Sequence, residues 1–249
     1  MAIAFLLWGY IAGVILFDGF LEKLKELFRT SSALKARLLA VKNAIALFLP
    51  SFEQYRYILQ RTATLLAVAE LTLCGLAALT GILLAFYYQP AAMEAHESLS
   101  AIARDIANGA VVLSLHHIAG QGLIVLALVQ IIVMFLGREF LPAWFAGWLS
   151  GIALTLTAIG LSWTAIVLDW EQTSFWRFRV ELNIVASIPW AGPILRDILS
   201  GGGGINSITL QHMYALHSYV LAIAAVLLSI LHLAALIYQE QHWKPAETR

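Results

Sequence analysis

Four histidines, at positions 116, 117, 217 and 232, fall inside long apolar stretches of this 249-residue chain. Ionisable side chains are costly in hydrocarbon, so they usually mark functional positions there. Two imidazoles from facing helices, brought to the same depth, can hold the iron of a membrane-buried haem. The single cysteine, Cys74, excludes an intramolecular disulfide framework and a CxxCH site for covalent haem. These residue types therefore favour non-covalent haem, whereas one buried histidine alone could simply bond a neighbouring helix.

The depths of the histidines agree with a shared cofactor. His116 lies about six residues from one end of its apolar stretch and His217 about four residues from the same end of its own, which puts both roughly 6–9 Å below that surface. His232 follows His217 by fifteen residues, about 22 Å deeper and rotated by only about 60°. That is the arrangement of a helix serving two haems. The position that should partner His232, fourteen residues after His116, holds Gln130 instead.

The elements that must position these residues are membrane helices. The chain is 61% hydrophobic and only 12% charged, and its 15 basic and 15 acidic residues leave no charge excess that would indicate a nucleic-acid partner. A span needs about 20 mainly apolar residues. Four stretches qualify, and we predict an all-α membrane protein with spans at roughly 62–88, 110–136, 146–168 and 213–238.

Residues 1–20 form a fifth, shorter apolar stretch. We predict an extra N-terminal membrane helix there, because no charged start or cleavage site of a secretory signal is present. An interfacial helix is the alternative, since Asp18 and the amphipathic LEKLKELF follow at once.

The distribution of lysine and arginine orients the spans. Eleven of these fifteen residues fall in residues 21–61, the 137–145 loop and the C-terminus, which therefore lie on the cytoplasmic side, here the n side. The two longer loops lie on the outer side, here the p side, and the second is expected to carry surface helices at 172–200 and a flexible turn at 201–204. We expect three parts: an N-terminal anchor and amphipathic segment (1–61), a four-helix bundle (62–238) and a cytoplasmic tail (239–249).

Several motifs keep their mutual spacing over roughly residues 60–238 and resemble cytochrome b6, which is similar to the N-terminal half of cytochrome b. The landmarks are TG and FYYQP at 80–90, MEAHESL at 93–99, Gly109 with Leu115 and His116, WEQ and W at 170–176, IP and G at 188–192, TL, Y and LH at 209–217, and His232. The resemblance implies a four-helix transmembrane haem-binding bundle.

The resemblance also implies roles for individual residues. It makes His116 and His217 the axial ligands of a p-side b haem, and His232 a present or former ligand of an n-side haem. Gly81 and Gly151 match glycines that let porphyrin approach the flanking helices; Ala67 and Ala165 occupy the two other such positions. His212 replaces an arginine of the family and is a candidate to face a haem propionate.

Departures from the family concentrate on the n side. Gln130 replaces the second n-side histidine, and an amide is a poor iron ligand beside imidazole. Leu65 stands where b6 proteins attach an extra n-side haem through cysteine, and no sequence here resembles the PEWY quinol-site motif. The resemblance thus implies one p-side haem b and leaves a second haem on the n side open.

Glu70 is the remaining candidate, because it lies one turn after Ala67 at a depth similar to Gln130 and His232. We predict that Glu70, Gln130 and His232 line one polar n-side pocket, able to take a proton, a quinone head group or a five-coordinate haem. The alternative is a glutamate near the helix start that extends toward the membrane surface or pairs with Arg61.

These observations predict an electron-transfer subunit of a quinol:acceptor oxidoreductase, not catalytic alone. The resemblance implies a hetero-oligomer with a second cytochrome b-type core subunit, an iron–sulfur protein or c-type cytochrome, and quinone, in a prokaryotic plasma membrane or a thylakoid. The alternative is a diverged haem-binding scaffold or assembly subunit. A proton-path transporter has no inverted repeat to support it.

Overall fold

A computed structural model describes residues 52–242, whose regular structure is entirely helical within that range. In chain order its elements are α3 (Phe52–Ala85), α4 (Ala95–Asp105), α5 (Gly109–Leu136), the 3₁₀ turn η1 (Pro142–Trp144), α6 (Phe145–Leu168), α7 (Gln172–Ala186), α8 (Gly192–Ser200), α9 (Ser207–Ala215), the π-helical η2 (Leu216–Leu221) and α10 (Ala222–His242). The helix predicted at residues 1–20, most of the amphipathic segment and residues 243–249 lie outside the described residues.

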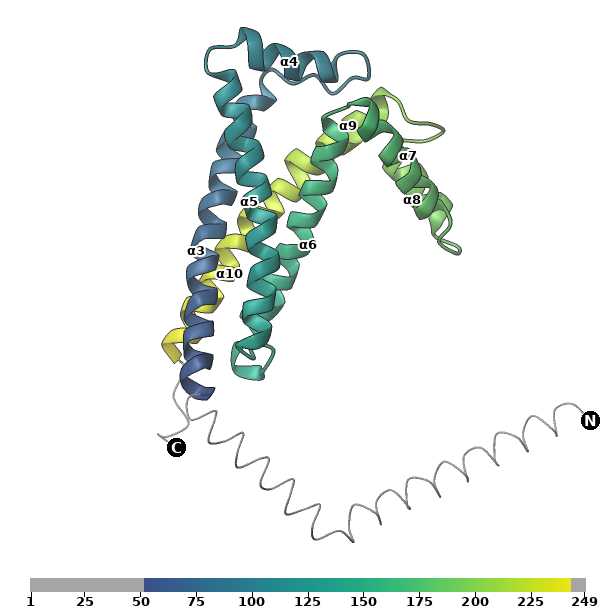
Figure 1. The fold of residues 1–249 in the computed structure, drawn as a ribbon. Helices are drawn as coiled ribbons and strands as arrows, with labels where there is room; N and C mark the ends of the chain where they lie inside the picture. Colours follow the sequence, from purple (N-terminus) through teal and green to yellow (C-terminus); the bar gives the residue numbers. More distant parts are fainter. Residues whose placement is uncertain (1–51, 243–249) are drawn as a thin grey trace, which may run out of the picture. The chain divides into compact units, whose positions relative to one another are not determined.

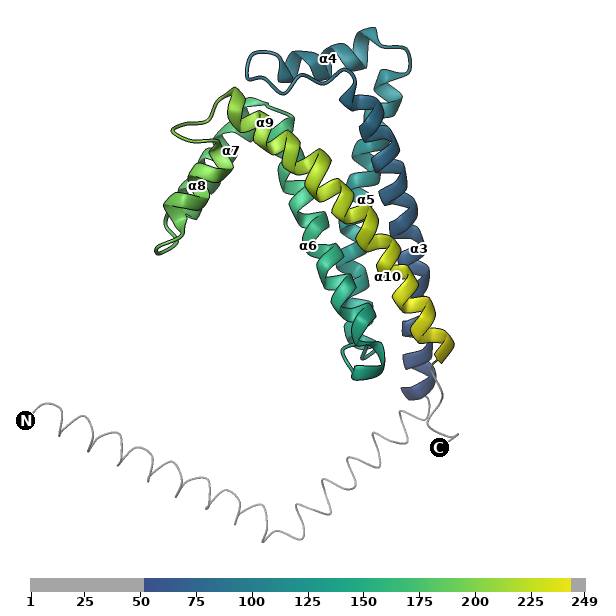
Figure 2. The ribbon, with the colours of Figure 1, turned by 180° about the vertical axis from the view of Figure 1, so that it is seen from behind.

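Within residues 52–242 four segments are long and apolar enough to cross a membrane, which confirms the prediction of an all-α membrane protein with a four-helix transmembrane bundle. α3, α5 and α6 run alongside one another, while α10 crosses obliquely and ends beside α3 (Figures 1 and 2). α6 packs against both α5 and α10. The segments that cross are Tyr55–Ala85, Gly109–Leu136, Pro142–Leu168 and Ser207–His242.

The helices meet through small buried residues and turn large apolar ones outward. Ala127 and Ala158 are at most 2% exposed and pack together in one cluster. Small side chains of this kind let membrane helices approach closely. Leu79, Ile118 and Leu156 are each more than 60% exposed, as expected for side chains that face lipid tails.

α3 begins ten residues before the apolar stretch from which its span was predicted. Its first turns carry polar residues, so the hydropathy of the sequence does not assign them to the span. Arg61 in this polar part and Thr64 just after it both bond Glu240 of α10, with Nη1 to Oε1 at 2.7 Å and Oγ1 to Oε2 at 3.0 Å. These contacts fix the n-side end of α3 to that of α10.

The p-side connections are short helices. α7 and α8 occupy the segment predicted to carry surface helices, and α7 is anchored by Trp163, whose Nε1 donates to Glu181 Oε2 at 2.6 Å. Phe178 of α7 is fully buried in a cluster with Val167 and Met213. α4 was not predicted; it packs against α5 on the same side of the bundle (Figure 1).

The glycine run before the last span is a left-handed turn. Gly201, Gly202 and Gly203 have φ values of 78°, 90° and 67°, a region that residues with a side chain rarely adopt. Asn206 then caps α9, because its Oδ1 accepts from the backbone N–H of Ile208 at 2.8 Å. The turn thereby sets where α9 begins, and so the position of His217, which follows α9 in the chain.

Candidate cofactor-binding site

The structure brings the His116 and His217 rings together. His116 comes from α5 and His217 from η2, and their ring centroids lie 6.4 Å apart with the planes inclined at 60°. A metal–imidazole bond is about 2 Å and the ring nitrogen lies about 1 Å from the centroid, so two imidazoles on opposite sides of one metal ion have centroids about 6 Å apart. The observed spacing fits one iron between the two rings.

The Nδ1 atom of His116 is already occupied. It lies 3.0 Å from the carbonyl oxygen of Ala77 and 3.1 Å from Thr80 Oγ1. A carbonyl oxygen only accepts, so Nδ1 carries the proton and donates it. Nε2 is then the unprotonated nitrogen, with its lone pair available for a metal. A bond of this kind on the far ring nitrogen typically orients a histidine ligand.

His217 has the same arrangement with a different partner. Its Nδ1 lies 2.8 Å from Oγ1 of Thr164, which is fully buried. That hydroxyl also lies 2.9 Å from the carbonyl oxygen of Gly160, to which it donates one turn back along α6. The hydroxyl oxygen therefore accepts from Nδ1 of His217, and Nε2 again keeps its lone pair.

His217 lies in the π-helical segment that joins α9 to α10. The backbone N–H of Ala222 bonds the carbonyl oxygen of His217 there, one residue beyond the α-helical partner. Single π turns inside α-helices are rare and are frequent at functional sites. The local widening sets the direction of the His217 ring relative to the rest of the span.

Gly81 faces the pair from α3. A Cβ atom at this position would lie 3.1 Å from Cε1 of His116, closer than ordinary van der Waals contact. Any larger side chain would displace the imidazole or occupy the space beside it. The position of the His116 ring therefore requires a residue without a side chain at position 81.

On the n side the structure brings Glu70, Gln130 and His232 into direct contact. All three are at most 1% exposed. With its amide nitrogen directed at Glu70, Gln130 donates to both carboxylate oxygens at 2.5 and 3.1 Å, while its amide oxygen accepts from His232 Nε2. His232 Nδ1 lies 2.9 Å from Oγ of Ser150. We name these four residues, Glu70, Gln130, Ser150 and His232, the n-side cluster.

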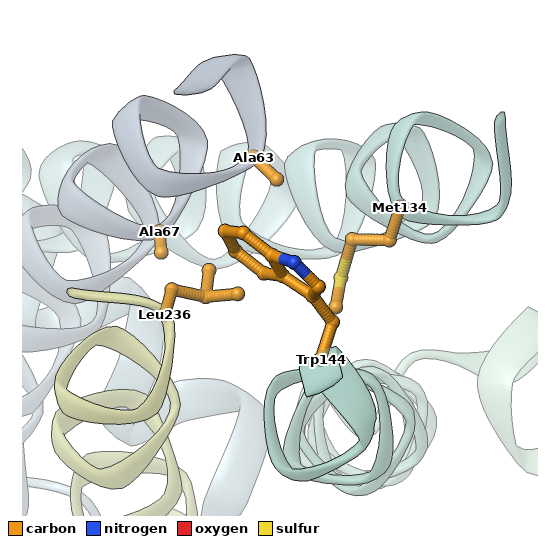
Figure 3. Close-up of a cluster of buried hydrophobic side chains, with 5 residues drawn as sticks. All are labelled: Ala63, Ala67, Met134, Trp144 and Leu236. Carbon is orange, nitrogen blue, oxygen red and sulfur yellow. The ribbon is translucent and has the colours of Figure 1, made fainter. Parts of the chain in front are cut away.

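The alternative in which Glu70 pairs with Arg61 does not occur, because Arg61 pairs with Glu240. Gly151 faces the n-side cluster: a Cβ there would lie 3.0 Å from Cε1 of His232 and 3.0 Å from Sδ of Met134. Met134 belongs to a buried apolar cluster that fills the neighbouring space (Figure 3). The members of that apolar cluster are Ala63, Ala67, Met134, Trp144 and Leu236.

The other histidines have local partners or are exposed. His212 lies on α9, exposed, with Nδ1 3.2 Å from the carbonyl oxygen of Ile198 rather than in contact with the His116 and His217 rings. His117 is exposed on α5. Within residues 52–242 no group of three His, Cys, Asp or Glu side chains is arranged to hold a metal ion.

Sequence reasoning missed the hydroxyl residues that hold the histidines. Thr80, Ser150 and Thr164 each stand directly before a small residue at which the family resemblance places the approach of porphyrin. Each also bonds the Nδ1 of one histidine. A hydroxyl residue followed by a small one in an apolar span was the signal that could have identified them.

Glu139, in the loop after α5, was also missed. Its side chain is fully buried and neither carboxylate oxygen has a hydrogen-bond partner. Burial raises the pKa of Glu139 to about 8, so the folded protein holds this carboxyl neutral at pH 7.

Known proteins resemble this chain in sequence and in fold. Residues 58–240 match the family model described as Cytochrome b/b6/petB. Cytochrome b6 of Prochlorococcus marinus is 25% identical over 153 residues, which are 61% of this chain and 70% of the relative. Cytochrome b6 of Mastigocladus laminosus is 26% identical over 153 residues, 61% of this chain and 71% of the relative.

A solved structure described as a hyperthermophilic respiratory Complex III superposes with a TM-score of 0.62 at 20% identity, a likeness of fold. The match covers 71% of this chain and 48% of that one, so the chain spans about half the length of its structural relative.

Proposed function

The chain belongs to the cytochrome b/b6 family, and from this premise we propose that it is an electron-transfer subunit whose b-type haem lies between His116 and His217 near the p surface. It is an integral membrane protein, with four candidate spans in residues 52–242. The observation that carries the proposal is the 6.4 Å spacing of the two imidazoles, each with its Nδ1 already bonded.

When bound, the haem supplies a one-electron couple, and the protein supplies ligands, orientation and electrostatics. Ala77 and Thr164 fix the tautomer of each ring, so that the free lone pair of each ring lies on Nε2. Thr80 gives His116 a second contact, and Gly81 leaves the ring room. Because these partners accept hydrogen bonds, they raise the basicity of the ligands and favour the oxidised iron.

The proposed partners follow from the family and from the matched respiratory chain, which is about twice as long as the matched region. We propose that a second cytochrome b-type core subunit completes a quinol-oxidising complex, and that an iron–sulfur protein or c-type cytochrome docks on the p surface. This chain alone would then carry electrons between quinol and that partner without catalysing the overall reaction.

A second candidate is a diverged scaffold subunit in which haem is structural. The observation that favours it is Gln130 in direct contact with His232, where the family resemblance places a second haem. The two candidates differ in whether the haem responds to quinol.

Reduced-minus-oxidised spectroscopy of the purified protein tests the proposal, with a short-chain quinol analogue as reductant. We expect a b-type spectrum that develops with quinol and is lost in His116→Leu and His217→Leu. His117→Leu is the matched control, because His117 is exposed on the same helix, and it should keep the spectrum. Haem that quinol does not reduce would favour the scaffold, and absence of haem would overturn both candidates.

A further inference from the structure

We propose that the n-side cluster takes the place of a second haem, so that this chain binds one haem and no iron is held at His232. The inference rests on the proposed function, since it counts haems in a protein that binds at least one. Three features of the described residues support it. Nε2 of His232 is occupied, the space beside that ring is packed with side chains, and hydrogen bonds within the n-side cluster join the helices.

The ring atom that would bind iron is engaged by a side chain. His232 resembles His217 in that its Nδ1 meets a hydroxyl of α6, Ser150 at 2.9 Å in one case and Thr164 at 2.8 Å in the other. The difference lies at Nε2. On His232 this nitrogen contacts the Gln130 amide directly, which leaves no room for a metal ion between the two side chains.

The space that a porphyrin would need is packed with side chains. Met134 and Leu236 are 0% exposed and Trp144 is 3% exposed, and their side chains converge on Ala63 and Ala67 (Figure 3). Protein interiors packed in this way hold few voids larger than a water molecule. By contrast, His116 and His217 are only partly buried, whereas His232 is 0% exposed.

The n-side cluster joins all four spans. Glu70 comes from α3, Gln130 from α5, Ser150 from α6 and His232 from α10. With the Gln130 amide oriented as described, each member of the n-side cluster has a partner within it: Nε2 of His232 donates to the Gln130 amide oxygen, so its Nδ1 is the nitrogen that accepts from the Ser150 hydroxyl. A fully satisfied polar network rigidifies its surroundings, and in hydrocarbon it holds helices together. Hydrogen bonds thus supply the cross-link that a bound haem would otherwise provide.

A functional consequence follows from the depth of the n-side cluster. His232 is fifteen residues from His217, about 22 Å along the helix. Without an iron at that depth, an electron that enters at the p-side pair has no haem relay toward the n surface within this chain. Donor and acceptor therefore exchange electrons on the same side of the membrane.

The haem-to-chain ratio of the purified full-length protein tests the inference. We expect one haem per chain in the parent protein and in His232→Leu, and loss of that haem in the matched variant His217→Leu. Two haems per chain, or loss of haem in His232→Leu with His217 intact, would overturn the inference while leaving the proposed function standing. No haem in the parent protein would instead overturn the proposed function itself.

A second measurement needs no variant, in case His232→Leu fails to fold. Potentiometric titration of the parent protein followed at the haem absorption band should give one single-electron transition. Two transitions of comparable amplitude would overturn the inference.

Discussion

Replacing Thr164 with valine removes the acceptor of the His217 ring and keeps the shape of the side chain. The hydroxyl lies 2.8 Å from Nδ1 of His217 and is fully buried, so no water replaces it. The Nδ1–H group is then left without its close acceptor in a region of low dielectric. We expect Thr164→Val to weaken haem binding and to raise the midpoint potential, because a less basic imidazole stabilises the oxidised iron less.

The loss of haem affinity in Thr164→Val can be calculated in two ways. Leaving a buried donor unsatisfied costs about 1–3 kcal/mol, which is roughly 5- to 150-fold in affinity. Loss of the outer partner of a metal-bound histidine typically costs about 10- to 100-fold. We therefore expect haem affinity to fall by about tenfold or more. Thr80→Val should cost less, because the Ala77 carbonyl oxygen remains 3.0 Å from Nδ1 of His116.

The assay is the rate and extent of haem transfer to excess apomyoglobin, with potentiometry on the same samples. Thr157→Val is the matched control, since this residue is on the same helix and its hydroxyl bonds only the Ala153 carbonyl oxygen of its own helix. Haem retention and potential in Thr164→Val that equal those of Thr157→Val would refute the role given to Thr164.

Two further predictions concern a glycine and a buried acid. Gly81→Val should lose haem, because even its Cβ would lie 3.1 Å from Cε1 of His116. Gly75→Val is the control on the same helix and should retain haem, because a Cβ there meets nothing within 4 Å. Equal haem contents of the two purified variants would contradict this. The pKa of Glu139 is raised to about 8 in the folded state from its ordinary value of 4.5. Between these two pH values the folded protein keeps a proton that the unfolded chain has released. The free energy of unfolding should therefore fall as pH rises from about 4.5 to about 8. Glu139→Gln should flatten that slope and stabilise the protein above pH 8 by a few kcal/mol in thermal unfolding, and an unchanged pH profile would contradict the assignment.

The spans were predictable because hydrocarbon imposes a simple rule on composition. Four apolar stretches gave four helices, and errors occurred where polar contacts decide the boundary. The polar first turns of α3 include Arg61, which bonds Glu240, 179 residues later in the chain. α4 was missed because its residues, AHESLSAIARD, are too polar to register as a membrane segment.

Helical periodicity predicted which candidate residues lie at the same depth, but not their contacts. Counting residues from the span ends placed His116 and His217 at one depth, and it also placed Gln130 opposite His232. It could not identify Thr164, whose contact with His217 depends on a π-helical turn that no sequence period encodes. Nor could it show that the n-side residues bond one another, since that depends on how closely the four spans approach.

Low-temperature electron paramagnetic resonance of the oxidised protein tests most directly whether His116 and His217 bind one iron together. The account predicts a single low-spin ferric signal from two imidazole ligands, kept in His117→Leu and replaced by a high-spin signal, or lost with the haem, in His116→Leu and in His217→Leu. A low-spin signal that survives unchanged in either of these two variants would contradict it.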